Sequence, residues 1–176
     1  MKKYLAILGL IILIASVSAV SAGLFDSNNS DNGIIKIESE DSSMKGTVEI
    51  YEFKNIKEND DGSYNITQFY DQDGLEKGKK HSITIKDGAA EYELHNDTEF
   101  FIVYYFITNI KPEYDLDNET APMVNVEYLY HGESMLSSSE EAYYDQCDIS
   151  FGSKVYKVNG DQVDLKADDP ELKEFV

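Results

Sequence analysis

Apolar residues fall into short runs rich in β-branched and aromatic side chains, and Asn-Gly or Asp-Gly pairs punctuate the chain. Such pairs tolerate the positive φ angles of hairpin turns, and short runs between turns are typical of antiparallel strands. The predicted strands cover residues 34–38, 47–54, 63–70, 82–86, 89–95, 99–110, 123–131, 148–151, 154–158 and 163–166. This pattern predicts an all-β fold, an antiparallel β-sandwich, in a single domain spanning residues 34–176.

The clearest predicted hairpin turns at Asp87-Gly88. A two-residue turn gives the cross-strand pairs Ile85 with Ala90, Ile83 with Tyr92, and His81 with Leu94. All of these apolar residues then lie on one face, as in an antiparallel sheet with one buried side. His81 lies on the core face in this register and His95 on the opposite face, so we do not expect these two histidines to share a metal ion.

A second hairpin is predicted at Asn159-Gly160. Either a two-residue or a four-residue loop places the same apolar set on one face, namely Tyr156, Val158, Val163 and Leu165. These residues are therefore expected to pack together.

The remaining patterns predict one central strand and two short helices. The run over residues 100–107 is apolar without alternation, which indicates a strand covered on both faces. Ser-Ser-Ser-Glu at residues 137–140 has the spacing of a capping box and predicts about two helical turns over residues 141–146. Asp-Pro-Glu at residues 169–171 predicts a short terminal helix over residues 169–176.

The first residues of the chain have the pattern of an export signal. Lys2 and Lys3 precede a segment that carries no charge as far as Phe25, and its residues 5–15 are densely apolar. Val20-Ser21-Ala22 meets the small-residue requirement of a signal peptidase, which predicts a signal peptide over residues 1–22 and a polar tether over residues 23–33. The alternative is an uncleaved signal-anchor helix. Either way, the domain is expected outside the cytoplasm, secreted or at the cell surface.

The net charge of the chain limits the classes of molecule that it is expected to bind. The chain has 176 residues with 34 acidic and 15 basic residues, and every basic residue is lysine, so its net charge is −19. Removal of residues 1–22 leaves 13 lysines and a net charge of −21. Nucleic acid is excluded as a partner because phosphate binding needs a basic face. Contact with a membrane is expected only through the N-terminal segment if it stays uncleaved.

Motifs for catalysis are absent, and calcium is the cofactor that the acidic loops suggest. The sequence contains no nucleophile elbow, phosphate-binding loop, HExxH or CxxC motif. Hard carboxylate oxygens in flexible loops suit Ca²⁺ in extracellular modules. The calcium candidates lie in two loops and are Asp71 and Asp73, and Asp115, Asp117 and Glu119. The alternative is that both loops are solvated acidic turns.

Three further features bear on the surface. Sequons at Asn28, Asn65, Asn96 and Asn118 are compatible with a glycoprotein. Tyr114, Tyr143 and Tyr144 lie in predicted loop or helix segments and could contact a sugar or a protein partner, whereas Tyr128 and Tyr130 alternate with core positions. Cys147 is the one cysteine, so no internal disulfide can form, and we expect it to act as a small apolar residue.

In general pattern, the short Asx-Gly hairpins, the unpaired cysteine and the exported acidic body resemble immunoglobulin-like modules of prokaryotic surface proteins. The Cys-Trp-Cys hallmark is missing because the chain has one Cys and no Trp, so no residue role follows. We expect a non-enzymatic cell-surface module that interacts with a protein or a glycan. The alternatives are a calcium- or carbohydrate-binding module and an exported hydrolase built on carboxylates.

Overall fold

The computed structural model describes residues 32–108, 122–141, 147–149, 151 and 154–167. Most of these residues lie in strands, and the one helix among them is a short 3-10 turn, Ile66–Gln68. No helix in these ranges is long and apolar enough to cross a membrane. The leader, the predicted terminal helix and residues 142–146 of the predicted internal helix lie outside the described residues.

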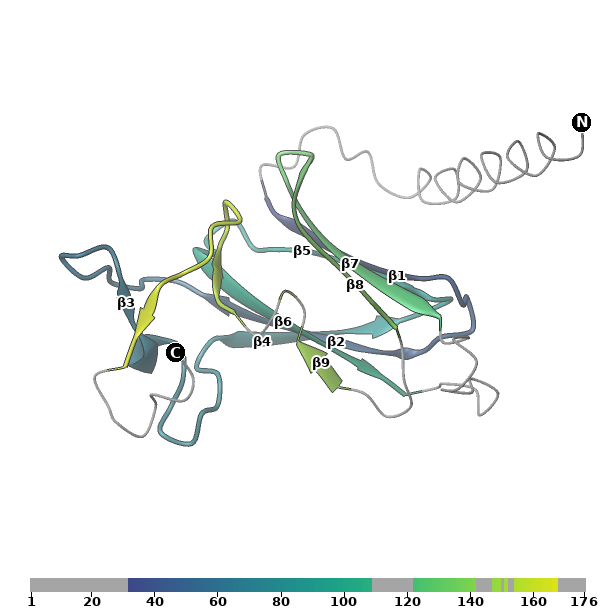
Figure 1. Cartoon of the computed structure of the whole chain (residues 1–176), viewed down its shortest axis with the longest axis horizontal. Coiled ribbons are helices and arrows are strands. Elements are labelled where there is room, and N and C mark those ends of the chain that lie inside the picture. Colours follow the sequence, from purple (N-terminus) through teal and green to yellow (C-terminus); the bar gives the residue numbers. More distant parts are fainter. Residues whose placement is uncertain (1–31, 109–121, 142–146, 150, 152–153, 168–176) are drawn as a thin grey trace, which may run out of the picture.

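The strands form two antiparallel sheets and a small parallel pair. Their bounds are β1 Ile34–Ser39, β2 Gly46–Phe53, β3 Tyr64–Asn65, β4 Lys79–Ile85, β5 Ala89–Glu93, β6 Phe100–Ile107, β7 Met123–Tyr130, β8 Glu133–Glu141, β9 Cys147–Ile149, β10 Tyr156–Lys157 and β11 Leu165–Lys166. One sheet has the order β5-β1-β7-β8, and the other has the order β10-β6-β2-β4 with β9 also paired to β6. The parallel pair β3-β11 lies at one end of the molecule (Figure 1).

The main core lies between the two sheets. It contains Ile35 and Ile37 from β1 and Val124, Val126 and Tyr128 from β7, together with Val48, Ile50, Phe101, Val103, Tyr105 and Ile107 from β2 and β6. A second, smaller cluster packs around Phe69 and includes aromatic rings in edge-to-face contact. Alternation in β1, β2 and β7 therefore buries one face of each strand, as the apolar pattern predicts.

The apolar run at residues 100–107 is a central strand, which confirms the prediction. β6 pairs with β2 along one edge and with β9 and β10 along the other. Phe101 and Val103 belong to the main core, whereas Phe100 and Ile102 belong to the second cluster. Both faces of this strand are covered because it separates the two clusters.

The hairpin predicted at Asp87-Gly88 has the expected turn but the wrong partners. Asp87 and Gly88 have positive φ angles of 52° and 77°, and a single bridge joins Lys86 to Ala89. Beyond that bridge β4 pairs with β2 and β5 pairs with β1, so the chain passes from one sheet to the other. Alternation correctly placed the inward side chains, but it determines only the face of a strand and carries no information about its partner.

Three further predictions need correction. Residues 137–141 belong to the edge strand β8, which pairs with β7, because sheet pairing outweighs the local capping sequence. The strand predicted over residues 63–70 shortens to β3, since the Asn65 side chain accepts a hydrogen bond from Thr67 N–H and caps the 3-10 turn. Gly160 turns the second hairpin, but Tyr156 and Val158 pack on the main core, whereas Val163 and Leu165 pack on the second cluster.

Candidate functional site

A buried carboxylate lies on the core-facing side of β2. Glu52 follows Val48 and Ile50 at the inward positions of this strand and is 6% exposed. It is the one buried acidic residue among those that the structure describes. A charge removed from water needs partners, so its neighbours define the site.

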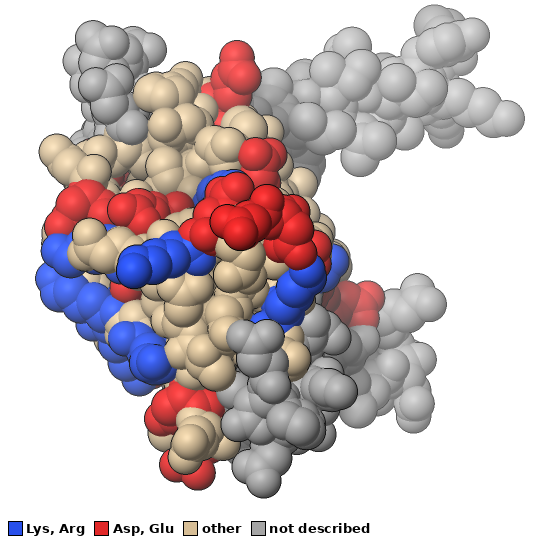
Figure 2. Space-filling model, turned by 90° about the vertical axis from the view of Figure 1, so that its left-hand side faces the viewer, with Lys and Arg blue, Asp and Glu red and all other residues tan. Residues whose placement is uncertain are grey.

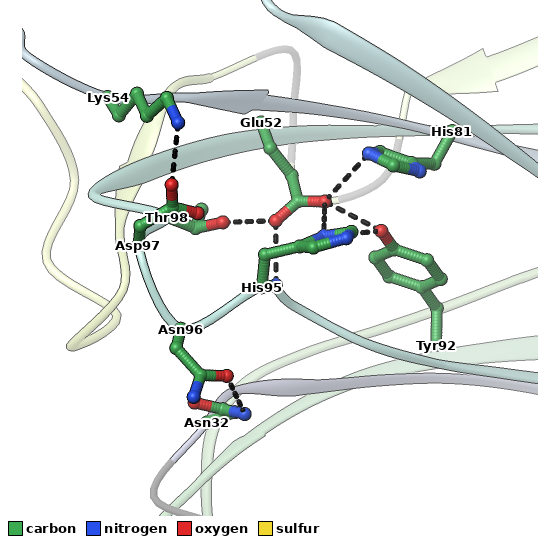
Figure 3. Close-up of polar contacts among 9 residues, drawn as sticks. All are labelled: Asn32, Glu52, Lys54, His81, Tyr92, His95, Asn96, Asp97 and Thr98. Carbon is green, nitrogen blue, oxygen red and sulfur yellow. Dashed lines mark hydrogen bonds and ion pairs between the residues drawn. The ribbon is translucent and has the colours of Figure 1, made fainter.

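The carboxylate of Glu52 accepts hydrogen bonds on both oxygens (Figure 3). The Thr98 hydroxyl and the His95 backbone N–H, the latter at 2.9 Å, donate to Oε2. The Tyr92 hydroxyl donates to Oε1 at 2.6 Å. Burial alone would raise the pKa of Glu52, but the hydrogen bonds from Thr98, Tyr92 and His95 outweigh burial and hold the pKa below its usual value. Glu52 is therefore a carboxylate at neutral pH.

Two histidines from different parts of the fold meet at this carboxylate. His81 Nε2 lies 3.2 Å and His95 Nδ1 lies 2.8 Å from Glu52 Oε1, and the two imidazole rings are 4.8 Å apart between centroids. The prediction that these histidines face away from each other is wrong. It assumed that β4 and β5 form one ladder, whereas β5 lies in the opposite sheet and the chain after it returns His95 toward β2.

The His81 ring has an unusual environment. Burial lowers its pKa, and the nearby Glu52 charge only partly opposes this effect, so the ring is neutral at pH 7. Its Nε2 atom is inaccessible to solvent and has no hydrogen-bond partner among the residues that the structure describes, although Glu52 Oε1 is close. The buried nitrogen and the carboxylate oxygen thus lie near each other without a hydrogen bond between them.

A cavity of about 430 Å³ opens beside this cluster. Glu52, His95 and Thr98 form part of its wall, and Phe53 and Ile56 add an apolar portion. The wall also contains three lysines and one further carboxylate, namely Lys54, Lys77, Lys79 and Asp97. The wall thus carries three cations and two carboxylates in a chain whose net charge is −19.

The lysines differ in how they are held. Lys54 pairs with Asp97 at 2.6 Å, and Lys77 donates to the Thr67 carbonyl oxygen at 2.8 Å. Lys79 is exposed and has no ion-pair partner among the described residues. On the end of the molecule that carries β3, lysine side chains gather on one side, beside a band of acidic side chains (Figure 2).

The calcium candidates are only partly described. Asp71 Oδ1 accepts hydrogen bonds from the backbone N–H groups of Asp73 and Leu75, both at 2.9 Å, so this oxygen organises the turn. Asp73 is exposed. The other candidates, Asp115, Asp117 and Glu119, lie outside the described residues.

The predicted glycosylation sites and aromatic contact residues are also only partly described. Asn65 caps the 3-10 turn, and exposed Asn96 accepts a hydrogen bond from Asn32 at 2.8 Å. Asn28, Asn118, Tyr114, Tyr143 and Tyr144 lie outside the described residues. Tyr128 is fully buried and Tyr130 packs at the edge of the main core, as their alternation predicts. Cys147 lies in β9, opposite Phe106 of β6.

Sequence reasoning missed Glu52, and one pattern could have found it. Glu52 continues the inward alternation of Val48 and Ile50, so it is a carboxylate on the apolar face of a strand. Comparison with known proteins adds no further residue: no family model, curated protein or solved structure matches the chain.

Proposed function

We propose that the protein is an exported β-sandwich domain at the cell surface, immunoglobulin-like in general architecture, that binds a carboxylated sugar without enzymatic activity. Export is supported by Lys2 and Lys3 before the uncharged apolar segment and by the small residues around Ala22. The sandwich is supported by the core that both sheets share. The binding site is the lysine-lined cavity.

The observation that carries this proposal is the charge of the cavity wall. Lys54, Lys77 and Lys79 gather around one concave site in a strongly acidic chain. Their ammonium groups favour an anionic ligand, and the acidic surface elsewhere repels the same ligand. The volume of about 430 Å³ is within the range of roughly 300–1,000 Å³ that is typical of small-molecule sites.

A carboxylated sugar fits both the polar and the apolar parts of the wall. Its carboxylate would pair with Lys79, which has no ion-pair partner among the described residues. Its hydroxyl groups would meet the polar groups of Thr98 and Asp97, and the ring would cover Ile56. An extracytoplasmic domain would meet such sugars in polymers at the cell surface.

The two carboxylates of the cavity support a binding function over hydrolysis. A glycosidase needs one carboxylic acid whose pKa is raised, so that it can protonate the leaving group. Hydrogen bonds hold the pKa of Glu52 below its usual value, and the Lys54 ammonium does the same for Asp97. Neither group is a proton donor at neutral pH.

The test is a titration of the purified chain, in EDTA, with digalacturonic acid and with the corresponding neutral galactose disaccharide. Amide chemical shifts and calorimetry report the position and strength of binding. Lys79→Gln removes a cavity charge, and Lys86→Gln removes another exposed charge, beyond the opposite end of β4.

We expect the acidic disaccharide to bind with shifts at Lys77, Gly78 and Asp97, and added salt to weaken it. Lys79→Gln should weaken binding about tenfold, because one charge-assisted contact is lost, and Lys86→Gln should leave it unchanged. Equal binding of the neutral disaccharide, equal effects of both variants or no binding at all would contradict the proposal.

A further inference from the structure

Three side chains that commonly bind metals converge beside the cavity, and two of them, Glu52 and His95, line it. They come from two neighbouring strands of one sheet and from the segment after β5: Glu52, His81 and His95. Glu52 and His81 are diagonal neighbours, because His81 pairs with Ile50 and Glu52 pairs with Lys79. We propose that Glu52, His81 and His95 bind one zinc ion, with one coordination position open to the cavity.

Three polar atoms crowd around one carboxylate oxygen of Glu52. Glu52 Oε1 has three neighbours within hydrogen-bond range: the Tyr92 hydroxyl at 2.6 Å, His95 Nδ1 at 2.8 Å and His81 Nε2 at 3.2 Å. A carboxylate oxygen has two lone-pair sites, so it cannot accept well from all three. Within the described part of the chain, His81 Nε2 is the atom left without a hydrogen bond, although it is closed off from water.

A metal ion resolves this arrangement. In the absence of a metal, His95 Nδ1 donates to Glu52 Oε1 in the tautomer that carries the proton on Nδ1, whereas His81 Nε2 has no hydrogen bond to a described residue. A divalent cation between the three atoms would accept the lone pairs of both ring nitrogens, with the His95 proton on Nε2, and would give His81 Nε2 the partner that it lacks. Burial of His81 favours its neutral form, which is the form that binds metals.

The distances place the three groups within reach of one ion. The three ligand atoms all lie within 4.8 Å of one another. Zinc bonds of about 2.0–2.2 Å place two ligands of a tetrahedral ion roughly 3.4 Å apart. The 2.8 Å contact of His95 with Glu52 must therefore lengthen slightly, and His81 already lies at nearly the required separation from Glu52.

Neighbouring groups already orient the carboxylate for this role. Thr98 and the His95 N–H donate to Oε2, so Oε1 is the oxygen turned toward both imidazoles (Figure 3). Such outer contacts are typical of metal sites and contribute to their affinity. The carboxylate is also already ionised, so metal binding requires no proton release from it.

The ligand types favour zinc over calcium. Two imidazoles and one carboxylate match the ligands of zinc sites that retain an open position, whereas calcium prefers oxygen ligands alone. Glu52 and His95 line the cavity, so solvent or an anionic group can reach the ion from that side. This inference goes beyond the sugar-binding proposal and does not depend on it, because the zinc test contains no sugar and the sugar test contains EDTA.

The test is calorimetric titration of the purified chain with ZnCl₂, after removal of metals with EDTA. His81→Gln and His95→Gln remove the two imidazoles. His131→Asn is the matched control, because the third histidine is exposed in the turn between β7 and β8 and Asn tolerates its positive φ of 51°. Circular dichroism in EDTA checks that each variant is folded.

We expect one zinc ion per chain, a loss of affinity of at least about 100-fold in His81→Gln and His95→Gln, and no change in His131→Asn. Calcium should not compete. No zinc uptake, or uptake that neither variant changes, would overturn the proposal.

A measurement on the unmodified chain covers the case in which a variant does not fold. Long-range ¹H–¹⁵N spectra resolve the ring nitrogens of each histidine. Addition of ZnCl₂ should shift Nε2 of His81 and Nδ1 of His95 and leave His131 unchanged. Shifts at His131 alone, or at none of the three rings, would overturn the site.

Discussion

The buried charge of Glu52 is compensated by hydrogen bonds from specific neighbouring donors. Thr98, Tyr92 and His95 each give one or two hydrogen bonds to it, and together they connect β2 to β5 and to the segment that enters β6. A single side chain therefore holds elements of both sheets at one end of the core.

Replacing Glu52 with Gln should lower the free energy of unfolding by about 2 kcal/mol, because an amide nitrogen then faces groups that are donors themselves. Urea unfolding measures this change. Glu49→Gln is the matched control on the other face of β2, where an exposed lysine is its partner, and it should cost less than about 0.5 kcal/mol. Equal losses in both variants would show that Glu52 does not organise the site.

Tyr128 tests a second buried polar contact. Its ring is fully buried, and its hydroxyl donates to the Val158 carbonyl oxygen at 2.5 Å. Tyr128→Phe keeps the ring but leaves that carbonyl without this donor, so we expect a loss of about 1–2 kcal/mol in urea unfolding. Tyr130→Phe, on a half-buried ring of the same strand, should change stability by less than about 0.5 kcal/mol. The reverse order would contradict the contact.

The pairing of β2 with β6 depends on a close approach at Gly46. A Cβ atom there would lie 2.1 Å from the Phe106 carbonyl oxygen, which belongs to the backbone and cannot move away cheaply. Gly46→Ala should lose about 3 kcal/mol. Gly132→Ala has open space and only an unfavourable φ of 79°, so it should lose about 1 kcal/mol. Thermal unfolding that ranks Gly132→Ala as the more harmful change would contradict this account of the sheet.

At the level of elements, local pattern predicted strands better than it predicted their pairing. Apolar runs placed β1, β2, β6 and β7 correctly because each buries a face. β8 was missed because it is serine-rich and lies at a sheet edge, where its partner β7 supplies the reason for its conformation.

The candidate site was missed for a related reason. Alternation along β2 could have identified Glu52 as an inward carboxylate, but its convergence with His81 and His95 depends on which sheet receives β5. That choice is made by contacts between residues far apart in the sequence, and no local pattern encodes it.

For the whole molecule, buried tyrosines predict sensitivity to alkali. Burial raises the pKa of Tyr70 to about 12 and also raises the pKa values of Tyr64, Tyr104, Tyr128 and Tyr156. An unfolded tyrosine ionises near pH 10, so above that pH the unfolded state loses protons that the native state keeps. The stability that the protonated, buried tyrosines contribute is therefore fully present below pH 10 and is lost as the pH rises toward 12.

For Tyr70 alone, a pH near 12 removes about 2 kcal/mol of stability. Urea unfolding at pH 9 and pH 11 measures the trend, and tyrosinate absorbance shows whether the rings ionise only on unfolding. A free energy of unfolding that is equal at both pH values, or tyrosines that all titrate near pH 10 in the folded chain, would contradict the burial of these rings.

The chain has a net charge of −19, but its charged residues are unevenly distributed over the folded molecule (Figure 2). Three of the lysines line one cavity beside Glu52, His81 and His95. We propose that the function of the protein lies at this one location, where the cation-lined wall and the proposed zinc ligands meet.

X-ray anomalous diffraction at the zinc absorption edge, on crystals equilibrated with ZnCl₂, tests this placement most directly. We predict one strong peak per chain within bonding distance of Glu52 Oε1, His81 Nε2 and His95 Nδ1, with its open side toward the cavity. A map without a peak there, or with its main peak at Asp71 and Asp73 or at His131, would contradict the account.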